Sequence, residues 1–225
     1  REGKNLLYEI HGEEKRTVIP FNEISQIVKE ATVVAEDVEF YKHAGINIRG
    51  ILRAILADIK GGMLLEGGSS ITQQLIKNAY LSPERTLSRK IKELILSIAL
   101  ERRYSKDEIL NFYLNQIPYG SNSYGIEAAA QTYFNKPAKE LNLAEVVYLV
   151  AMPKAPSYYS PYGNHGEELK SRANHILSRM RELKYVSDND YNNALKTTVN
   201  FVGQKTGIVA PHFVMFIRDY LNEKY

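Results

Sequence analysis

Apolar residues recur at intervals of three and four along most of the chain, which predicts a mainly α-helical domain with minor β structure. The predicted helices cover residues 24–36, 48–63, 70–79, 82–103, 105–114, 125–134, 142–152, 166–185, 188–196 and 211–223. Two strand-like runs within 5–20 predict a hairpin around the polar turn 11–15, and 197–202 predicts a short strand. Residues 118–124 are rich in Gly, Ser and Asn and are expected to form a loop.

Helix boundaries are marked by capping residues. Ser82-Pro83 is typical of a helix start, with an N-cap followed by proline at the first helical position. Ser105 with Glu108, and Asn142 with Glu145, have the spacing of capping boxes. We find no internal repeat and no low-complexity linker, so we expect residues 1–225 to form a single domain.

Composition narrows the functional classes. The chain has 225 residues, of which 44% are hydrophobic and 24% charged, and it has no Cys. This composition is that of a globular protein and excludes disulfide scaffolds and thiolate chemistry. The formal net charge of +3 is too small to indicate a nucleic-acid partner. The first residue is Arg1, so we expect a fragment of a longer protein whose flanks carry anchors or further domains.

A first candidate stretch, residues 35–45, carries Glu36, Asp37, Glu39 and His43 at the C-terminal end of an apolar helix. Carboxylates there oppose the helix dipole, so an acid at this position tends towards a raised pKa. That property suits a general base. The alternative is an ordinary polar helix end.

A second stretch, residues 67–78, begins with Gly67-Gly68 and Ser69 before a helix start, where backbone N–H groups can approach an anion. It is not a nucleotide-binding phosphate loop, since it lacks the Gly-Lys-Ser/Thr ending. Polar residues that include Gln74, Lys77 and Asn78 cover much of the helix. They would line a cleft or belong to an exposed helix.

A third stretch begins at Arg85. Leu87, Ile91, Leu94, Ile95 and Ile98 form one apolar stripe of the predicted helix, and Arg85, Arg89, Lys92 and Glu93 gather on its far side, with Lys90 at the border. Residues 77–106 contain eight basic and three acidic side chains. The alternative is a solvated face with Arg89 and Glu93 as an i,i+4 pair.

The three stretches together fit one reaction. A sugar joined to pyrophosphate leaves with negative charge growing on phosphate oxygens, which a metal ion or Lys and Arg must stabilise. Glu36 can supply the base for the attacking hydroxyl. Asp188 and Asp190 have carboxylate spacing but follow Ser187 at a helix start, so capping explains them. The histidines show no ligand spacing, and we expect cationic side chains rather than a protein-bound metal.

Five motifs in order over residues 35–161 resemble the signatures of the peptidoglycan glycosyltransferase domain of bifunctional class A penicillin-binding proteins and of monofunctional peptidoglycan glycosyltransferases. They are Glu36-Asp-x-x-Phe40-x-x-His43-x-Gly45; Gly67-Gly-Ser-Ser-Ile-Thr-Gln-Gln74-x-x-Lys77-Asn78; Arg85-x-x-x-Arg89-Lys90-x-x-Glu93; Lys106-Asp-Glu-Ile-Leu110-x-x-Tyr113-Leu-Asn115 with Tyr124-Gly-Ile126 and Tyr133-Phe134; and Leu143-Ala-Glu145 with Pro153-Lys-Ala-Pro156-Ser157. The sequence departs from the family at three positions. The family usually has Thr at the position of Ser70, often Asp at that of Asn47 and often Gly at that of Asn122.

The resemblance implies a lysozyme-like, two-lobed helical fold with a large head lobe and a small membrane-facing jaw lobe at about 41–70. It implies polymerisation of lipid II into β-1,4-linked glycan strands, with inversion and release of undecaprenyl pyrophosphate. Glu36 would be the general base, and Glu93 a second catalytic carboxylate. Lys77, Arg85 and Lys90 would hold the donor pyrophosphate and Arg89 would orient them. Asp37, Ser69, Gln74 and Asn78 would contact sugar or phosphate.

The resemblance also implies partners and a location. These are lipid II and the growing glycan chain, the membrane surface, and moenomycin as an inhibitor at the donor site. A divalent cation, Mg²⁺ or Mn²⁺, would assist with the pyrophosphate, and no organic cofactor is expected. A bacterial cytoplasmic-membrane location with the domain on the outer face follows, with an N-terminal membrane helix and a C-terminal transpeptidase domain outside this chain. The apolar stripe and basic residues of 48–63 are typical of a helix that lies on a membrane surface. The alternative is an ordinary core helix.

Two other functions stay open from the residues. A lysozyme-like glycan-cleaving enzyme also uses a glutamate in a cleft, but it needs no cation cluster beside it. A non-catalytic module that binds anionic lipid or peptidoglycan would not need Glu36 as a base.

Overall fold

The computed structural model describes residues 15–47, 68–81 and 86–203, with three single positions after residue 216. Its α-helices are α1 (Gln26–Glu36), α3 (Ile71–Tyr80), α4 (Leu87–Arg103), α5 (Lys106–Gln116), α6 (Ile126–Phe134), α7 (Leu143–Ala151), α8 (Gly166–Glu182) and α9 (Asp188–Lys196). Short 3₁₀ turns cover Phe21–Glu23 (η1), Phe40–Lys42 (η2), Ala138–Glu140 (η3) and Met152–Lys154 (η4). The prediction of a mainly helical domain with minor β structure is confirmed. The helices predicted at 48–63 and 211–223 lie outside the described residues or almost entirely so.

Side-chain caps set most of the helix starts. Ser105 with Glu108 and Asn142 with Glu145 form the predicted capping boxes of α5 and α7. The predicted start of α4 at Ser82 is wrong, because α4 begins at Leu87. Thr86 is its N-cap, and the Thr86 hydroxyl accepts the backbone N–H of Arg89 at 3.1 Å.

Residues 118–124 form a tight hairpin instead of the predicted loop. β2 (Pro118–Gly120) and β3 (Ser123–Tyr124) pair antiparallel. Ser121 and Asn122 join them, both at positive φ (49° and 56°), which is the conformation that a two-residue hairpin turn needs. Asn tolerates this region, so Asn122 suits the turn. The strands are too short to show an alternating pattern in the sequence.

β1 (Lys15–Arg16) completes the sheet, whose strand order is β1-β3-β2, by pairing parallel with β3. Most of the hairpin predicted within 5–20 lies outside the described residues, and Lys15 belongs to a strand and not to the predicted turn. The strand predicted at 197–202 is wrong. That segment is irregular and is held by single contacts, such as Val202 N–H to Tyr133 O at 2.9 Å, and not by a ladder.

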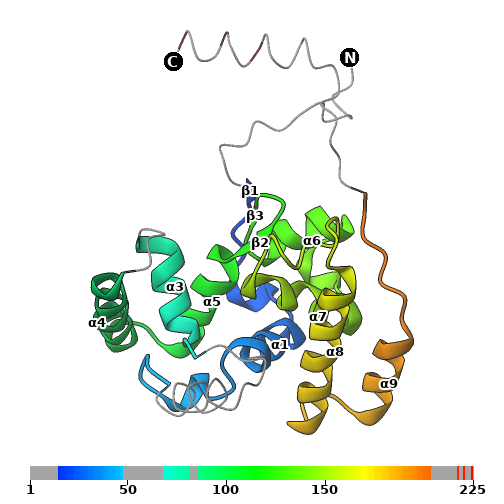
Figure 1. The fold of residues 1–225 in the computed structure, drawn as a ribbon, viewed down its shortest axis with the longest axis horizontal. Coiled ribbons are helices and arrows are strands. Elements are labelled where there is room, and N and C mark those ends of the chain that lie inside the picture. The colour runs from blue at the N-terminus through cyan, green and yellow to red at the C-terminus, as the bar shows by residue number, and fades with distance from the viewer. Residues whose placement is uncertain are drawn as a thin grey trace.

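The helices form two groups with α1 between them (Figure 1). α3 packs against α4 and α5 on one side, and α7 packs against α8 and α9 on the other. α1 packs on α7 and α8, and its apolar residues Val28, Ala31, Val33 and Val34 are buried in the core. This arrangement places the C-terminal end of α1, which carries Glu36, between residues of α3 and α8.

Candidate active site

Glu36 is the last residue of α1, and its carboxylate is held from two sides. The Gln74 side-chain amide, on α3, donates to Oε2 at 2.8 Å. Nη2 of Arg172, on α8, donates to Oε1 from 3.4 Å. The Glu36 side chain is 8% exposed. The carboxylate is therefore oriented by groups from both halves of the helical assembly.

Burial raises the pKa of Glu36 above the ordinary value of 4.5. The positive charge of Arg172, the hydrogen bond from Gln74 and the charge of Lys154 act in the opposite direction, since each favours the ionised form. A carboxylate with a raised pKa is a stronger base than an exposed one. The electrostatics suit the general base predicted here.

The Gln74 amide is itself fixed in one orientation. The Tyr113 hydroxyl, on α5, donates to Gln74 Oε1 at 3.3 Å, so the amide N–H₂ faces Glu36. Burial, reinforced by the Glu36 charge, raises the pKa of the Tyr113 and Tyr119 hydroxyls well above their usual range. Both tyrosines therefore stay neutral beside Glu36.

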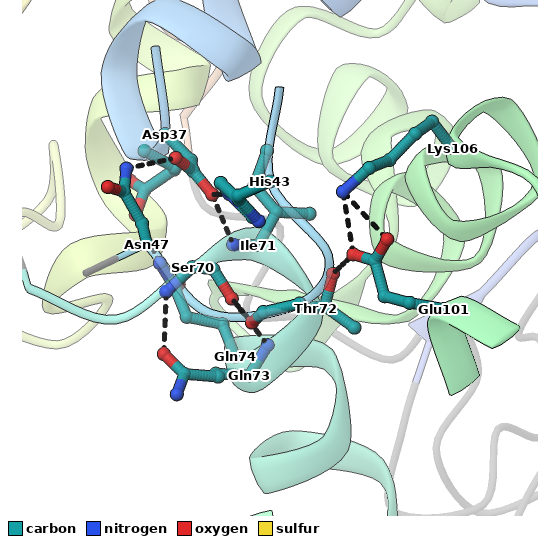
Figure 2. Close-up of polar contacts among 12 residues, drawn as sticks. Asp37, His43, Asn47, Ser70, Ile71, Thr72, Gln73, Gln74, Glu101 and Lys106 are labelled. Carbon is teal, nitrogen blue, oxygen red and sulfur yellow. Dashed lines mark hydrogen bonds and ion pairs between the residues drawn. The ribbon is translucent and has the colours of Figure 1, made fainter. Parts of the chain in front are cut away.

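Asp37 is buried and its carboxylate is engaged within the protein. It accepts the Asn47 amide at 2.9 Å, the backbone N–H of Ile71 at 3.3 Å, and contacts His43 Nε2 at 2.7 Å. Figure 2 shows these contacts joining the loop after α1 to the first turn of α3. The Asn47 amide can donate to Asp37 where a second carboxylate could not.

Further contacts fix the N-terminus of α3. Ser70 and Gln73 form a capping box, and the Ser70 hydroxyl donates to Gly45 O at 2.6 Å. On the other side of α3, Glu101 accepts from Thr72 and from Lys106 (Figure 2). The segment before α3 is therefore held from several elements.

The predicted cations Arg89 and Lys90 lie together around Glu93 on α4. Lys90 Nζ forms an ion pair with Glu93 and donates to Ser69 Oγ at 3.1 Å. Arg89 Nη1 lies 3.4 Å from Glu93, as the predicted i,i+4 pair, and Arg89 Nε is buried without a hydrogen-bond partner. The Glu93 side chain is 2% exposed, so this face of α4 is not simply a solvated charged face.

The predicted apolar stripe of α4 lies largely on the outside. Leu87, Ile91 and Ile95 are 79%, 50% and 61% exposed, whereas Glu93 and Ser97 are the buried residues of this helix. The side of α4 that faces the protein therefore carries the polar residues Glu93 and Ser97, and most of the apolar stripe lies on the side that faces solvent. This orientation brings Lys90 to Ser69.

α3 links the two groups of predicted residues. Ser69, just before α3, contacts Lys90, and Gln74 on α3 contacts Glu36. Lys77 and Asn78 follow Gln74 by three and four positions, so they share its helix face, and both are exposed. Arg85 lies outside the described residues.

Two neighbours of Glu36 were missed from the sequence. Arg172 lies on the apolar face of α8, among Leu169, Ala173 and Ile176. A charged residue within an apolar helix face is unusual, and this could have marked Arg172 as a candidate site residue. Lys154 lies within the Pro153–Ser157 part of the fifth motif, but its position in the sequence did not predict that its charge would act on Glu36.

Metal-ligand clusters are not found where the structure describes the chain: no three His, Cys, Asp or Glu side chains converge there. Ser187 accepts the backbone N–H of Asp190 at 3.1 Å, so the predicted capping role of the Asp188–Asp190 segment is confirmed. A pocket of about 470 Å³ between α1, α7 and α9 is lined by Ile27, Leu143, Val186 and Ala194 and others, and it includes none of the predicted site residues.

Comparisons with known proteins identify the family of this chain. A family model described as transglycosylase matches residues 3–181. Penicillin-binding protein 1A of Aquifex aeolicus (strain VF5) is 40% identical over 224 residues, which cover 100% of this chain and 31% of that protein. Penicillin-binding protein 1F of Bacillus subtilis (strain 168) is 47% identical over 174 residues, covering 77% of this chain and 24% of that protein.

The fold is also similar to a solved structure. The crystal structure of Penicillin-Binding Protein 1A from Haemophilus influenzae matches with a TM-score of 0.58 and 25% identity, over 95% of this chain and 22% of that one. The chain thus spans about a third or less of the length of these relatives.

Proposed function

This chain belongs to the transglycosylase family, as the peptidoglycan glycosyltransferase domain of class A penicillin-binding proteins, and we propose that its substrate is lipid II. In this proposal the domain joins lipid II units into β-1,4-linked glycan strands with inversion and releases undecaprenyl pyrophosphate. The observation that carries it is a buried, clamped glutamate linked through α3 to a cluster of cationic side chains. A sugar transfer from pyrophosphate needs both parts.

On the acceptor side, Glu36 takes the proton of the sugar 4-hydroxyl. The acceptor oxygen then forms its bond to C1 of the donor sugar, and the bond from C1 to the pyrophosphate oxygen breaks. The electron pair of that bond leaves with the pyrophosphate. Gln74 and Arg172 orient the Glu36 carboxylate by donating one hydrogen bond to each of its two oxygens. Each oxygen therefore keeps a free lone pair that can accept the proton of the sugar hydroxyl.

On the donor side, Lys90, Arg89, Lys77 and Arg85 meet the charge that grows on the pyrophosphate. Glu93 holds Lys90 and Arg89 in place, and Lys90 contacts Ser69 at the start of α3. The buried Arg89 Nε without a hydrogen-bond partner is a donor suited to a phosphate oxygen. Gln74 and Asn78 would contact substrate from the same face of α3.

In this proposal a divalent cation, Mg²⁺ or Mn²⁺, binds together with the pyrophosphate of the substrate. Glu93 is already paired with two cations, and the described residues hold no cluster of metal-ligating side chains. Such an ion would therefore be bound chiefly by the pyrophosphate oxygens, where it would add positive charge. The protein's own contribution is Lys90, Arg89 and Ser69.

We further propose a lysozyme-like arrangement of two lobes, with the small lobe at about 41–70 facing a bilayer on the outer side of the cytoplasmic membrane. None of the described helices is long and apolar enough to cross a membrane. Support comes from α4, on which the apolar residues Leu87, Ile91 and Ile95 and the cations Lys92, Arg102 and Arg103 are all exposed. Apolar and basic side chains on one surface favour contact with anionic lipid.

The test is turnover of purified lipid II by this chain and by its Glu36→Gln variant, with and without moenomycin. We expect polymer from the wild type, its loss with moenomycin, and near-complete loss in Glu36→Gln with folding and lipid binding retained. Fragments released from preformed glycan, without polymer from lipid II, would indicate a glycan-cleaving enzyme instead. Unchanged function in Glu36→Gln would indicate a binding module.

A further inference from the structure

We propose that Arg172 is a positioning residue for sugar transfer, which holds the Glu36 carboxylate in its reactive orientation and compensates its buried charge. This inference rests on the proposed role of Glu36 as the general base. The two residues are 136 positions apart in the sequence, and their side chains meet between α1 and α8.

The position of Arg172 needs a specific explanation. Its side chain is 3% exposed, and the other buried residues of α8 are apolar: Leu169, Ala173, Ile176, Leu177 and Met180. A buried guanidinium is costly unless it is paired and hydrogen-bonded. Packing alone would favour Leu or Met at this place, so the arginine has a role other than filling the core.

The guanidinium is held on two sides that do not involve Glu36. Nε donates to the carbonyl oxygen of Ala151, the last residue of α7, at 3.0 Å. The guanidinium also lies over the Tyr159 ring, 5.8 Å from its centroid. A cation at a helix C-terminus is favoured by the helix dipole. Arg172 is therefore fixed before it reaches Glu36 and can act as a rigid reference for the carboxylate.

The contact between Arg172 and Glu36 leaves the carboxylate able to accept a proton. Nη2 lies 3.4 Å from Oε1, a long hydrogen bond that stabilises the negative charge without occupying the whole carboxylate. An arginine does not release its proton in proteins, so it cannot exchange one with Glu36. A lysine at the same position could do so and would lack the planar group that also reaches Ala151.

The groups that face Glu36 come from five elements. They are Gln74 on α3, Tyr113 on α5, Tyr119 on β2, Lys154 on the turn η4 and Arg172 on α8. Burial raises the pKa of Glu36, and Arg172 is the strongest of the groups that lower it again. Loss of Arg172 would therefore leave Glu36 protonated over a wider range of pH.

The experiment compares Arg172→Gln and Arg172→Lys with Arg179→Gln, a matched change two turns along α8 whose partner is Glu182. The first readout is the pH dependence of kcat for lipid II polymerisation. For Arg172→Gln we expect kcat at pH 7 to fall about 100-fold with KM changed less than about threefold, as misplacement of a reacting group predicts. The acid limb should move to higher pH, so that part of the activity returns as pH rises. Arg172→Lys should show a smaller loss, and Arg179→Gln the wild-type profile.

The second readout is an NMR titration of the Glu36 carboxyl carbon, which requires no turnover. We expect the Glu36 pKa to be higher in Arg172→Gln than in the wild type and in Arg179→Gln. An unchanged Glu36 titration and an unmoved acid limb in a folded Arg172 variant would overturn the proposal, because a purely structural role predicts both. If the wild type makes no polymer but the Glu36 pKa is still higher in Arg172→Gln than in the wild type, the proposed function is overturned and the pairing of Arg172 with Glu36 stands.

Discussion

The Gln74 side-chain amide donates to Oε2 of Glu36 at 2.8 Å, and this contact joins the end of α1 to α3. Gln74 is held in turn by the Tyr113 hydroxyl, which fixes the direction of its amide. The same helix begins next to Ser69, which contacts Lys90. α3 is thus the element that sets Glu36 and Lys90 in relation to each other.

The Gln74 contact predicts a pH effect. A donor to the ionised form lowers the pKa of an acid, so loss of the Gln74 amide should raise the Glu36 pKa further above 4.5. A general base works when deprotonated, so Gln74→Met should lose most activity at low pH and recover as pH rises. The measurement is the pH profile of kcat/KM for lipid II.

The matched control for this profile is Gln131→Met on α6, where the glutamine is exposed and bonded to Glu127. It should keep the wild-type profile. An activity loss in Gln74→Met that is the same at every pH would contradict the electrostatic argument and would indicate a contact with substrate instead.

Asp37 predicts an effect on stability. Its carboxylate accepts from Asn47 and from the Ile71 backbone and contacts His43, and its side chain is 1% exposed. Asp37→Ala removes the acceptor and leaves buried donors without partners, so the free energy of unfolding should fall by about 3 kcal/mol. Urea denaturation followed by circular dichroism measures this change.

Asp188→Ala, at a carboxylate 88% exposed, serves as the control and should change stability far less. If Asp37 instead contacts sugar or phosphate, as the sequence predicts, the result should differ. Asp37→Ala would then keep the stability of the wild type and lose affinity for lipid II.

Local parts of this fold could be predicted from the sequence, because their causes lie within a few residues. The capping boxes at Ser105 and Asn142 involve partners three positions away, and the apolar spacing of α1 fixes which side it buries. The hairpin at Ser121 and Asn122 could not be predicted from its pattern, since its strands have two or three residues each.

The site shows the same division. Glu36, Lys90 and Glu93 could be predicted as site residues because they stand in recognisable motifs. The approach of Arg172 to Glu36 spans 136 positions and depends on how α8 packs against α1, which no local spacing encodes. The outward turn of the apolar stripe of α4 was likewise hidden, because a hydrophobic pattern predicts an amphipathic helix but not which side faces the protein.

Lys90 predicts an effect on the chemical step. Its ammonium is placed by Glu93 and Ser69, where it can meet the charge that develops on the leaving pyrophosphate. Removal of one preorganised donor of this kind costs about 10²–10³ in kcat, and Lys90→Ala should show a loss of that size. Lys92→Ala changes an exposed lysine of the same helix and should have little effect. Equal losses in the two variants would mean that the overall charge of α4 matters and not the placement of Lys90.

The exposed apolar side of α4 predicts binding to a bilayer. Leu87, Ile91 and Ile95 are each at least half exposed, so replacing them leaves the core intact, and the triple change to Ser should not alter the melting temperature. Full burial of such side chains stabilises by about 1.5–3 kcal/mol each, and partial insertion of three should account for a tenfold change in binding or more.

Sedimentation with vesicles that contain anionic lipid measures this binding. We expect the partition coefficient of the triple variant to fall at least about tenfold, since a tenfold change needs about 1.4 kcal/mol. The matched control changes Val18, Leu183 and Leu195 to Ser, which are exposed apolar residues outside α4, and it should bind like the wild type. Because salt screens the basic residues but not the apolar contact, part of the wild-type binding should persist at high ionic strength. Equal binding of the α4 variant and the wild type would show that this side of α4 does not contact lipid.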